Sequence, residues 1–255
     1  MAQNLGAALS LEQLLTSAED AMRNGLFAAA ESICADVLDK HPNNARVLYI
    51  RGACLVRQAK RRPGLRDLEK AAKLAPGDAA ILLELCRGLL ADGAAVVAEK
   101  RLREAVDQFR GHPGMLRDFA ELFMRLGHHG DAIPLLDRAL LANPTDAAAF
   151  NMRGYALQQL GDHPRAVGNF TRALVLQPGF HHAANNRGNS LLAQGRFAEA
   201  LKDYDMAIAI DPAYVHAWSN RAKVLEQMGR EEEARASTAR AAALAPRFPA
   251  AKSGA

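Results

Sequence analysis

The side chains that most often carry chemistry are few in this chain, and they do not gather. Cys34, Cys54 and Cys86 are odd in number, lie 20 and 32 residues apart and form no CxxC pair. That spacing supports neither a disulfide framework nor a zinc site, so we interpret them as buried free thiols. His128 and His129 lie together on a predicted turn, with no thiol or carboxylate cluster beside them. These residues therefore predict no metal centre and no thiol nucleophile.

Motifs of catalytic and cofactor-binding loops are missing as well. The chain contains no Walker loop and no GxGxxG, HExxH or GxSxG pattern. His182 and His216 lie 34 residues apart, and on neighbouring packed helices, about 8–10 Å apart, they would be too distant for one metal ion. We therefore expect a protein that is not an enzyme and needs no cofactor.

Four arginines suggest pairing instead of catalysis. Each is followed, sixteen residues later, by a side chain that can accept a hydrogen bond: Arg51 by Asp67, Arg153 by Asn169, Arg187 by Asp203 and Arg221 by Ser237. Where Ser17, Leu85 or Phe119 replaces the arginine, the later residue is Ile33, Arg101 or Leu135. A buried guanidinium without a partner is costly. We therefore predict hydrogen-bonded or salt-bridged pairs between two helices, with a structural role.

Proline sets the period on which these residues recur. Its positions are Pro42, Pro76, Pro144, Pro178, Pro212 and Pro246, spaced by 34 residues except for one gap of 68, where Arg110 occupies the missing place. The period divides the chain into an N-terminal extension (1–10), seven units and a C-terminal tail (249–255). The units are 11–44, 45–78, 79–112, 113–146, 147–180, 181–214 and 215–248.

Within each unit, small and bulky residues occupy fixed positions. Positions 8, 20 and 27 are small with few exceptions, positions 4 and 11 are mostly Leu or aromatic, and position 15 is Gly except for Ala59. Positions 4, 8 and 11 share one face of a helix, and positions 20, 24 and 27 share a face of a second. Small residues let the helices approach closely, glycine permits the turn, and proline ends the second helix. Such a pair buries its apolar face only against stacked neighbours, which predicts an all-α array.

This pattern resembles the tetratricopeptide repeat over residues 11–248. The most similar unit is 147–180, with Phe150, Gly154, Leu157, Gly161, Ala166, Phe170, Ala173 and Pro178 in the places that the family uses. In the unit 45–78 the glycine is displaced, because the turn reads Ala59-Lys60-Arg61-Arg62-Pro63-Gly64. The resemblance implies a right-handed superhelical α-solenoid of antiparallel helix pairs. Its first helices would line a concave groove that binds an extended peptide or protein segment.

In the family, positions 2, 5, 9, 12 and 13 face that groove. The resemblance therefore implies a peptide-binding set that changes along the chain. The first four units contribute Arg46, Tyr49, Arg57, Arg87, Arg117 and Arg125; the last three contribute Asn151, Tyr155, Gln158, His182, Asn185, Asn189, His216 and Ser219. Arginine binds carboxylates through a planar fork, and amides bind a peptide backbone. We expect an extended, partly acidic peptide, with a solvated face that binds nothing as the alternative.

A second resemblance concerns the later units. The segments Asn186-Arg187-Gly188-Asn189 and Gly195-Arg196-Phe197-Ala198-Glu199-Ala200 are similar to the repeats that precede O-linked N-acetylglucosamine transferase-like and bacterial sulfotransferase domains. They imply, as an alternative, a substrate-recruiting arm of a larger enzyme whose catalytic domain is not in this chain. Asn186 and Asn220 would be two rungs of the transferase's asparagine ladder, which the five earlier units do not continue.

Composition and charge narrow the partners and the compartment. Of 255 residues 49% are hydrophobic and 24% charged, with a net charge of +4, which is a globular balance. We expect no nucleic-acid partner, and we interpret the run Lys60-Arg61-Arg62 as a solvated loop. The longest stretch without a charge has 14 residues, too short for a membrane span. With no secretory signal visible in residues 1–10, we expect a cytoplasmic protein. The Ala, Arg and Gly bias suggests a bacterial one.

The end of the array leaves three interpretations open. No separate solvating helix follows the last unit. Either the second helix of the unit 215–248 is polar enough to cap the array, or the chain continues in a longer parent, or it dimerises there.

Overall fold

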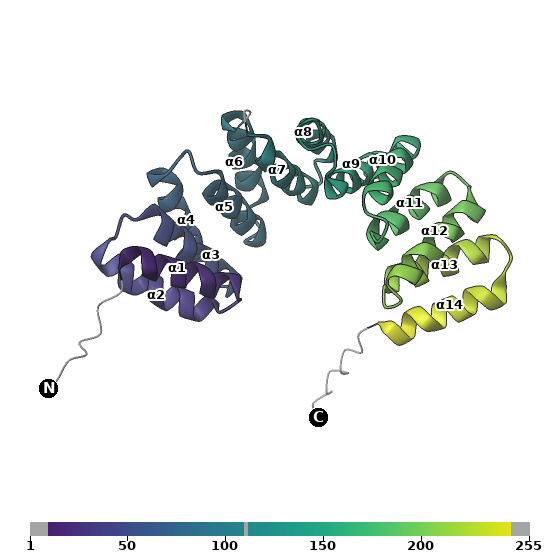
Figure 1. The fold of residues 1–255 in the computed structure, drawn as a ribbon, viewed down its shortest axis with the longest axis horizontal. Helices are drawn as coiled ribbons and strands as arrows, with labels where there is room; N and C mark the ends of the chain where they lie inside the picture. Colours follow the sequence, from purple (N-terminus) through teal and green to yellow (C-terminus); the bar gives the residue numbers. More distant parts are fainter. Residues whose placement is uncertain (1–9, 110–111, 246–255) are drawn as a thin grey trace, which may run out of the picture. The chain divides into compact units, whose positions relative to one another are not determined.

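The computed structural model describes residues 10–109 and 112–245, and every regular element in these ranges is an α-helix (Figure 1). The first helix of each pair is α1 (Leu11–Arg23), α3 (Ala45–Arg57), α5 (Ala79–Ala91), α7 (Pro113–Arg125), α9 (Ala147–Gln159), α11 (His181–Ala193) and α13 (Val215–Gln227). The second is α2 (Phe27–Lys40), α4 (Arg61–Leu74), α6 (Ala95–Gln108), α8 (His129–Ala142), α10 (His163–Leu176), α12 (Phe197–Ile210) and α14 (Glu231–Leu244). The predicted all-α solenoid of antiparallel helix pairs is confirmed.

The chain folds as two compact blocks, which we describe separately. The N-terminal block runs from Met1 to Leu126 and the C-terminal block from Gly127 to Ala255. Each first helix begins at the first residue of a predicted unit. The predicted unit 113–146 therefore contributes α7 to one block and α8 to the other. The predicted extension (1–10, apart from Ser10) and tail (249–255) lie outside the described residues.

A residue in the left-handed region forms the turn of every hairpin. The six glycines at this position, Gly25, Gly93, Gly127, Gly161, Gly195 and Gly229, have φ between +72° and +82°. The prediction of a glycine turn is confirmed for these six. In the repeat 45–78, Ala59 itself adopts φ +61°, and the displaced Gly64 lies inside α4 and takes no part in the turn.

The predicted stop signals also coincide with helix ends. α2, α4, α8, α10 and α12 each end two residues before a proline of the 34-residue series. Two expected turns are shorter than the sequence suggested: α4 already begins at Arg61, and α8 begins at His129. The run Lys60-Arg61-Arg62 is exposed to solvent, as expected, but it lies at the start of α4 and not in a loop. Lys60 Nζ also lies 2.8 Å from a carboxylate oxygen of Glu31 on α2.

Small residues lie in the helix contacts within each block, as predicted. Ala132, Ala166 and Ala200, at position 20, are completely buried. At position 8, a Cβ placed on Gly154 would lie 2.7 Å from the ring of Phe170, and one placed on Gly188 would lie 2.7 Å from the ring of Tyr204. The aromatic rings of α10 and α12 thus fill the space that a missing side chain leaves open on α9 and α11.

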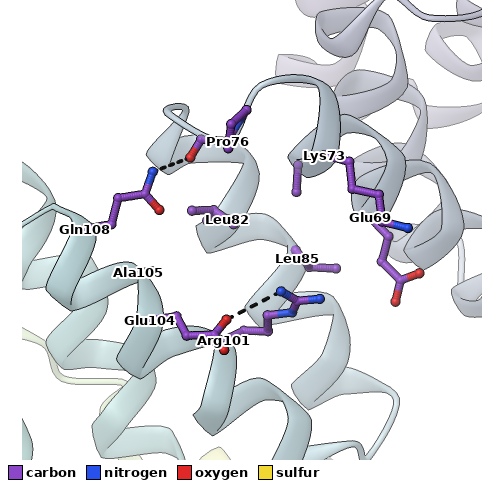
Figure 2. A pocket seen from close by; sticks show the side chains of 10 residues that line it. Glu69, Lys73, Pro76, Leu82, Leu85, Arg101, Glu104, Ala105 and Gln108 are labelled. Carbon is purple, nitrogen blue, oxygen red and sulfur yellow. Dashed lines mark hydrogen bonds and ion pairs between the residues drawn. The ribbon is translucent and has the colours of Figure 1, made fainter.

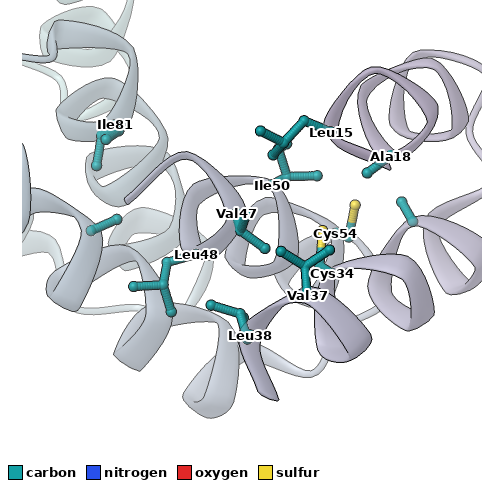
Figure 3. Close-up of a cluster of buried hydrophobic side chains, with 12 residues drawn as sticks. Leu15, Ala18, Cys34, Val37, Leu38, Val47, Leu48, Ile50, Cys54 and Ile81 are labelled. Carbon is teal, nitrogen blue, oxygen red and sulfur yellow. The ribbon is translucent and has the colours of Figure 1, made fainter. Parts of the chain in front are cut away.

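The core of the N-terminal block continues from one repeat to the next. Figure 3 shows one cluster to which all helices from α1 to α5 contribute, with Leu15, Val37, Ile50 and Ile81 among its members. Stacking of neighbouring repeats therefore buries apolar helix faces that a single hairpin would leave exposed to solvent.

The three cysteines are buried free thiols, as expected. Burial raises the pKa of Cys34 to about 12 and the pKa values of Cys54 and Cys86 to about 11. Since the thiolate is the reactive form, these side chains pack as small hydrophobic groups at neutral pH.

All four predicted arginine pairs are formed between the helices of a hairpin. Arg51 and Arg187 each donate from Nε and Nη2 to both oxygens of Asp67 and Asp203, at 2.6–2.9 Å. The other two pairs have single bonds: Arg153 Nε donates to Asn169 Oδ1 at 2.7 Å, and Arg221 Nη1 donates to Ser237 Oγ at 2.6 Å. The interpretation of these residues as structural pairs is confirmed by this geometry.

Candidate functional site

The residues predicted to bind a peptide lie on the first helices of the repeats. We call the side of these helices that carries positions 2, 5, 9, 12 and 13 the first-helix face, and each block has its own. Side-chain caps fix the start of several of these helices: Asn44, Asp78 and Asp146 accept hydrogen bonds from backbone amides of the first turn of α3, α5 and α9. The candidate side chains thus come from helices of constant length and constant starting position.

In the N-terminal block, Arg46 is held by two carboxylates of the preceding repeat. Its Nε donates to Glu19 Oε1 at 2.7 Å, and its Nη1 lies 3.4 Å from Glu12 Oε2. The hydrogen bond to Glu19 is the largest cause of a raised pKa of Arg46. This cluster of one guanidinium and two carboxylates has a net charge of −1, so Arg46 is a poor binding site for another anion.

Arg57 and Arg87 share a single carboxylate, that of Glu84 on α5. Arg57 Nη1 donates to Glu84 Oε1 at 2.7 Å and to the backbone oxygen of Ala53 at 3.0 Å. Arg87 Nη1 lies 3.7 Å from Glu84 Oε2. Glu84 is only 4% exposed, whereas the side chains of Arg57 and Arg87 are 39% and 35% exposed. Glu84 was not among the residues predicted to take part in binding.

The remaining candidates of this block differ in exposure. Tyr49 is half-buried, packs against the core, and has a pKa raised by burial and by the nearby charge of Glu84. Arg117 and Arg125 are exposed on α7.

In the C-terminal block, amide side chains link one first helix to the next. Asn186 Nδ2 on α11 donates to Asn151 Oδ1 on α9 at 3.3 Å, and Gln158 Nε2 on α9 donates to the backbone oxygen of Asn186 at 3.1 Å and to Ser190 Oγ at 3.0 Å. One repeat further on, Asn220 Nδ2 donates to Asn185 Oδ1 at 3.0 Å. The structure thus joins α9, α11 and α13 through a row of amides, which we call the amide row.

Several predicted ligands of a peptide backbone therefore already have partners. Asn185 is 4% exposed and belongs to the interior of the amide row. Asn189 Oδ1 accepts a hydrogen bond from the hydroxyl of Tyr204 at 2.9 Å, which leaves its amide donors outside that contact. An amide group has two donor hydrogens and two acceptor lone pairs, so Asn151 and Asn189 keep binding capacity that these single contacts do not use.

Rings accompany the amide row. Tyr155 is exposed and meets His129 edge-on, with ring centroids 6.0 Å apart. The ring of Tyr214 lies 5.1 Å from that of His182 and 5.5 Å from that of His216, and both histidines are exposed. Burial, helped by His181 and His216 and opposed by Asp211, lowers the pKa of His182. Ser219, the last predicted residue, is half-buried on α13.

Neither a metal cluster nor a membrane span is found in residues 10–109 and 112–245. No three or more of the His, Cys, Asp and Glu side chains described there are placed to hold one ion. None of the helices described is both long enough and apolar enough to cross a bilayer.

A cleft of about 250 Å³ lies away from the candidate residues, between the second helices α4 and α6 (Figure 2). Leu82 and Leu85 of α5 line it together with Arg101 and Glu104, and Gln108 Nε2 donates to the backbone oxygen of Pro76 at its edge. Leu85 stands where four other repeats have the paired arginine, so this cleft has an apolar lining there. This apolar lining alone does not identify a ligand.

The outer side of α14 is polar. Its exposed side chains include Glu231, Glu232, Arg235, Thr238 and Arg240, and no large hydrophobic side chain of α14 is exposed. That this helix caps the array stays a prediction.

The comparisons with known proteins agree with this architecture. Family models described as tetratricopeptide repeat match residues 15–61, 117–180, 151–215 and 191–254, which together cover more than half of the chain. No curated protein sequence gives a significant match.

Solved structures share the fold at low sequence identity. A tetratricopeptide repeat protein from Parabacteroides merdae is 18% identical with a TM-score of 0.71, over 92% of this chain and 93% of that one. The C-terminal part of a repeat protein from Cytophaga hutchinsonii is 19% identical with a TM-score of 0.68, over 92% and 96%. YrrB, described as a TPR protein with an unusual peptide-binding site, is 20% identical with a TM-score of 0.57, over 72% and 95%. With its repeated hairpins, its glycine turns and these matches, the chain belongs to the tetratricopeptide repeat family.

Proposed function

We propose that this protein is a non-catalytic interaction scaffold that holds an extended peptide or protein segment along its first-helix faces. The observation that carries the proposal is the amide row of the C-terminal block. Its side chains bridge successive helices, so they are fixed before any ligand arrives, and fixed donors and acceptors lose little conformational freedom on binding.

The composition of this face suits a peptide backbone. In the part of the chain that the structure describes, no hydrogen bond uses the amide donors of Asn151 or Asn189, and the exposed rings of Tyr155, His182 and His216 belong to the same first-helix face. Amides recognise main-chain groups with little regard to sequence, whereas rings give apolar contact to side chains. The fold similarity to YrrB, whose description names a peptide-binding site, supports the same reading.

The proposed compartment is the cytoplasm of a bacterium. Three buried reduced thiols are compatible with a reducing environment. In the alternative setting of a recruiting arm of a larger enzyme, the same faces would hold the substrate protein.

The test starts with random 12-residue peptides displayed on phage and selected on the immobilised chain. The affinity of a selected peptide is then measured by fluorescence polarisation for the wild type and for Asn151→Ala and Asn189→Ala. We expect each variant to weaken binding about three- to tenfold, the range of one lost hydrogen bond.

Two choices keep this test clean. Asn185 is left unchanged, because its burial would make Asn185→Ala a folding variant. Lys202→Ala on the exposed side of α12 is the matched control, and it should bind like the wild type. Unchanged affinity in both asparagine variants, or an equal loss in the control, would contradict the proposal.

A further inference from the structure

We propose that Arg57 and Arg87, positioned by the buried carboxylate of Glu84, form a subsite that binds a carboxylate group of the peptide partner. This inference rests on the proposed function and adds the partner's chemistry: the segment that crosses the N-terminal block carries an acidic residue.

The donors of the two arginines support this assignment. Both hydrogen bonds of Arg57 leave from Nη1, and the ion pair of Arg87 also uses Nη1. Among the described residues, Nε and Nη2 of these two side chains have no hydrogen-bond partner. Both side chains are more than one-third exposed. A guanidinium offers Nε and one Nη as a fork that matches the two oxygens of a carboxylate.

Net charge favours Arg57 and Arg87 over Arg46 as the binding site for a carboxylate. Arg57, Arg87 and Glu84 sum to +1, whereas Arg46 with Glu12 and Glu19 sums to −1. Another acid of this region, Asp78, accepts from the amides of Ala80 and Ile81 through Oδ1 at the start of α5. The positive end of that helix offsets the charge of Asp78.

Glu84 acts as a positioning residue and not as a ligand. With 4% exposure it is out of reach of a partner, and its two oxygens serve different arginines from α3 and α5. An ionised carboxylate in such a place is expensive unless charged donors surround it. Here the donors are the two side chains that it holds beside each other, so two forks are fixed on adjacent helices before a ligand binds.

The experiment compares two fluorescein-labelled octapeptides, one alternating Glu and Gly and one alternating Gln and Gly, on the full chain. We expect Arg87→Gln and Arg57→Gln each to weaken the glutamate peptide at least fivefold and to leave the glutamine peptide within twofold. Arg62→Gln is the matched control: it removes one positive charge from the exposed start of α4 in the same block, outside the first-helix face, and it should change neither affinity more than twofold. Circular dichroism melting of each variant verifies that the repeats remain folded.

Glu84→Gln separates positioning from simple attraction. The substitution raises the cluster charge from +1 to +2, so a non-specific positive field would bind the glutamate peptide more tightly. Positioning predicts weaker binding of that peptide, by about threefold or more, with the glutamine peptide unaffected.

Equal losses in Arg62→Gln and Arg57→Gln, or tighter binding by Glu84→Gln, would overturn the subsite. If both peptides bind with the same affinity to the wild type, the subsite is wrong while the scaffold proposal stands. If neither peptide binds and the selected phage peptides do not bind either, both proposals fail.

Discussion

The two blocks contain the same kind of hairpin, but different types of side chain connect the helices on their first-helix faces. In the N-terminal block the face is crossed by ion pairs between residues 27 positions apart, such as Glu19 with Arg46 and Arg57 with Glu84. In the C-terminal block it is crossed by amide pairs 35 positions apart, Asn151 with Asn186 and Asn185 with Asn220. The comparison shows that the small residues and the turns determine the fold of the hairpin. The side chains of the first-helix face can therefore be charged in one block and amides in the other.

The helix contacts behind the faces differ too. In the hairpin α3–α4 of the N-terminal block, Gly52 and Gly64 bring two backbones together, and a Cβ on Gly52 would lie 2.9 Å from the backbone oxygen of Gly64. In the C-terminal block a ring lies against each glycine, Phe170 on Gly154 and Tyr204 on Gly188. The same small position thus serves close backbone approach in one block and a bulky ring in the other.

The largest expected effect concerns the paired arginine. Leu85 shows that the N-terminal block tolerates leucine at this position, but in the C-terminal block Arg187→Leu would strand the 4%-exposed Asp203. We expect a loss of about 3 kcal/mol in the free energy of unfolding, measured by urea titration. The double variant Arg187→Leu/Asp203→Leu should recover most of it. A double variant as unstable as the single one would show that the lost volume, and not the stranded charge, is responsible.

The next effect tests the ring-on-glycine contact. Gly188→Ala places a Cβ 2.7 Å from the ring of Tyr204, and overpacking of this kind costs about 1–3 kcal/mol. Gly168→Ala is the matched control on α10, where a Cβ meets nothing within 4 Å. There the higher helix propensity of alanine should stabilise the protein by up to about 1 kcal/mol. Melting curves that move in the same direction for both variants would contradict the packing argument.

A smaller effect is expected when the turn residue of one block is replaced by that of the other. Ala59→Gly removes the strain of a left-handed alanine and should stabilise the N-terminal block by about 0.5–1 kcal/mol, after the added freedom of the unfolded chain is subtracted. Gly161→Ala, at the same turn in the C-terminal block, should cost about 1 kcal/mol. Thermal melting of both variants measures the difference, and equal shifts would mean that the turn tolerates either residue.

The smallest effect is a pH dependence confined to the C-terminal block. The pKa of His182 lies below its ordinary value of 6.5 in the folded protein, so on acidification the unfolded chain takes up the proton first. Stability is therefore complete above about pH 6.5 and decreases as the pH falls through that value. The charges that face His182 are those of His181, His216 and Asp211. Comparing melting temperatures at pH 7.5 and 5.5, we expect a smaller decrease in His182→Gln than in the wild type.

The fold could be predicted from the sequence because its determinants repeat. A glycine or a proline at every 34th residue reports a local requirement of the backbone, and local requirements are visible in a single chain. The offset of sixteen residues between Arg187 and Asp203 was visible for the same reason, since both positions recur. Ala59 was the exception, because the turn imposed its conformation on a residue that does not prefer it.

The candidate site was only partly predictable. The resemblance to the family assigned Arg57 and Asn185 to a face, but it did not say that each already had a partner. Comparing equal positions of the repeats overlooks contacts between unequal ones, such as position 13 of one repeat with position 6 of the next, and this concealed Glu84. The offset of 27 was the available signal, because Glu19 with Arg46 and Glu31 with Gln58 share it.

The short range of the helix contacts has a consequence for how the protein forms. Within each block, the helices described contact no partner beyond the second one along the chain. Chain closure is therefore inexpensive in entropy, and proteins with such low contact order fold fast. Folding can nucleate at any hairpin and spread to its neighbours. An emerging chain of this design could begin to fold on the ribosome as soon as two hairpins have left the exit tunnel.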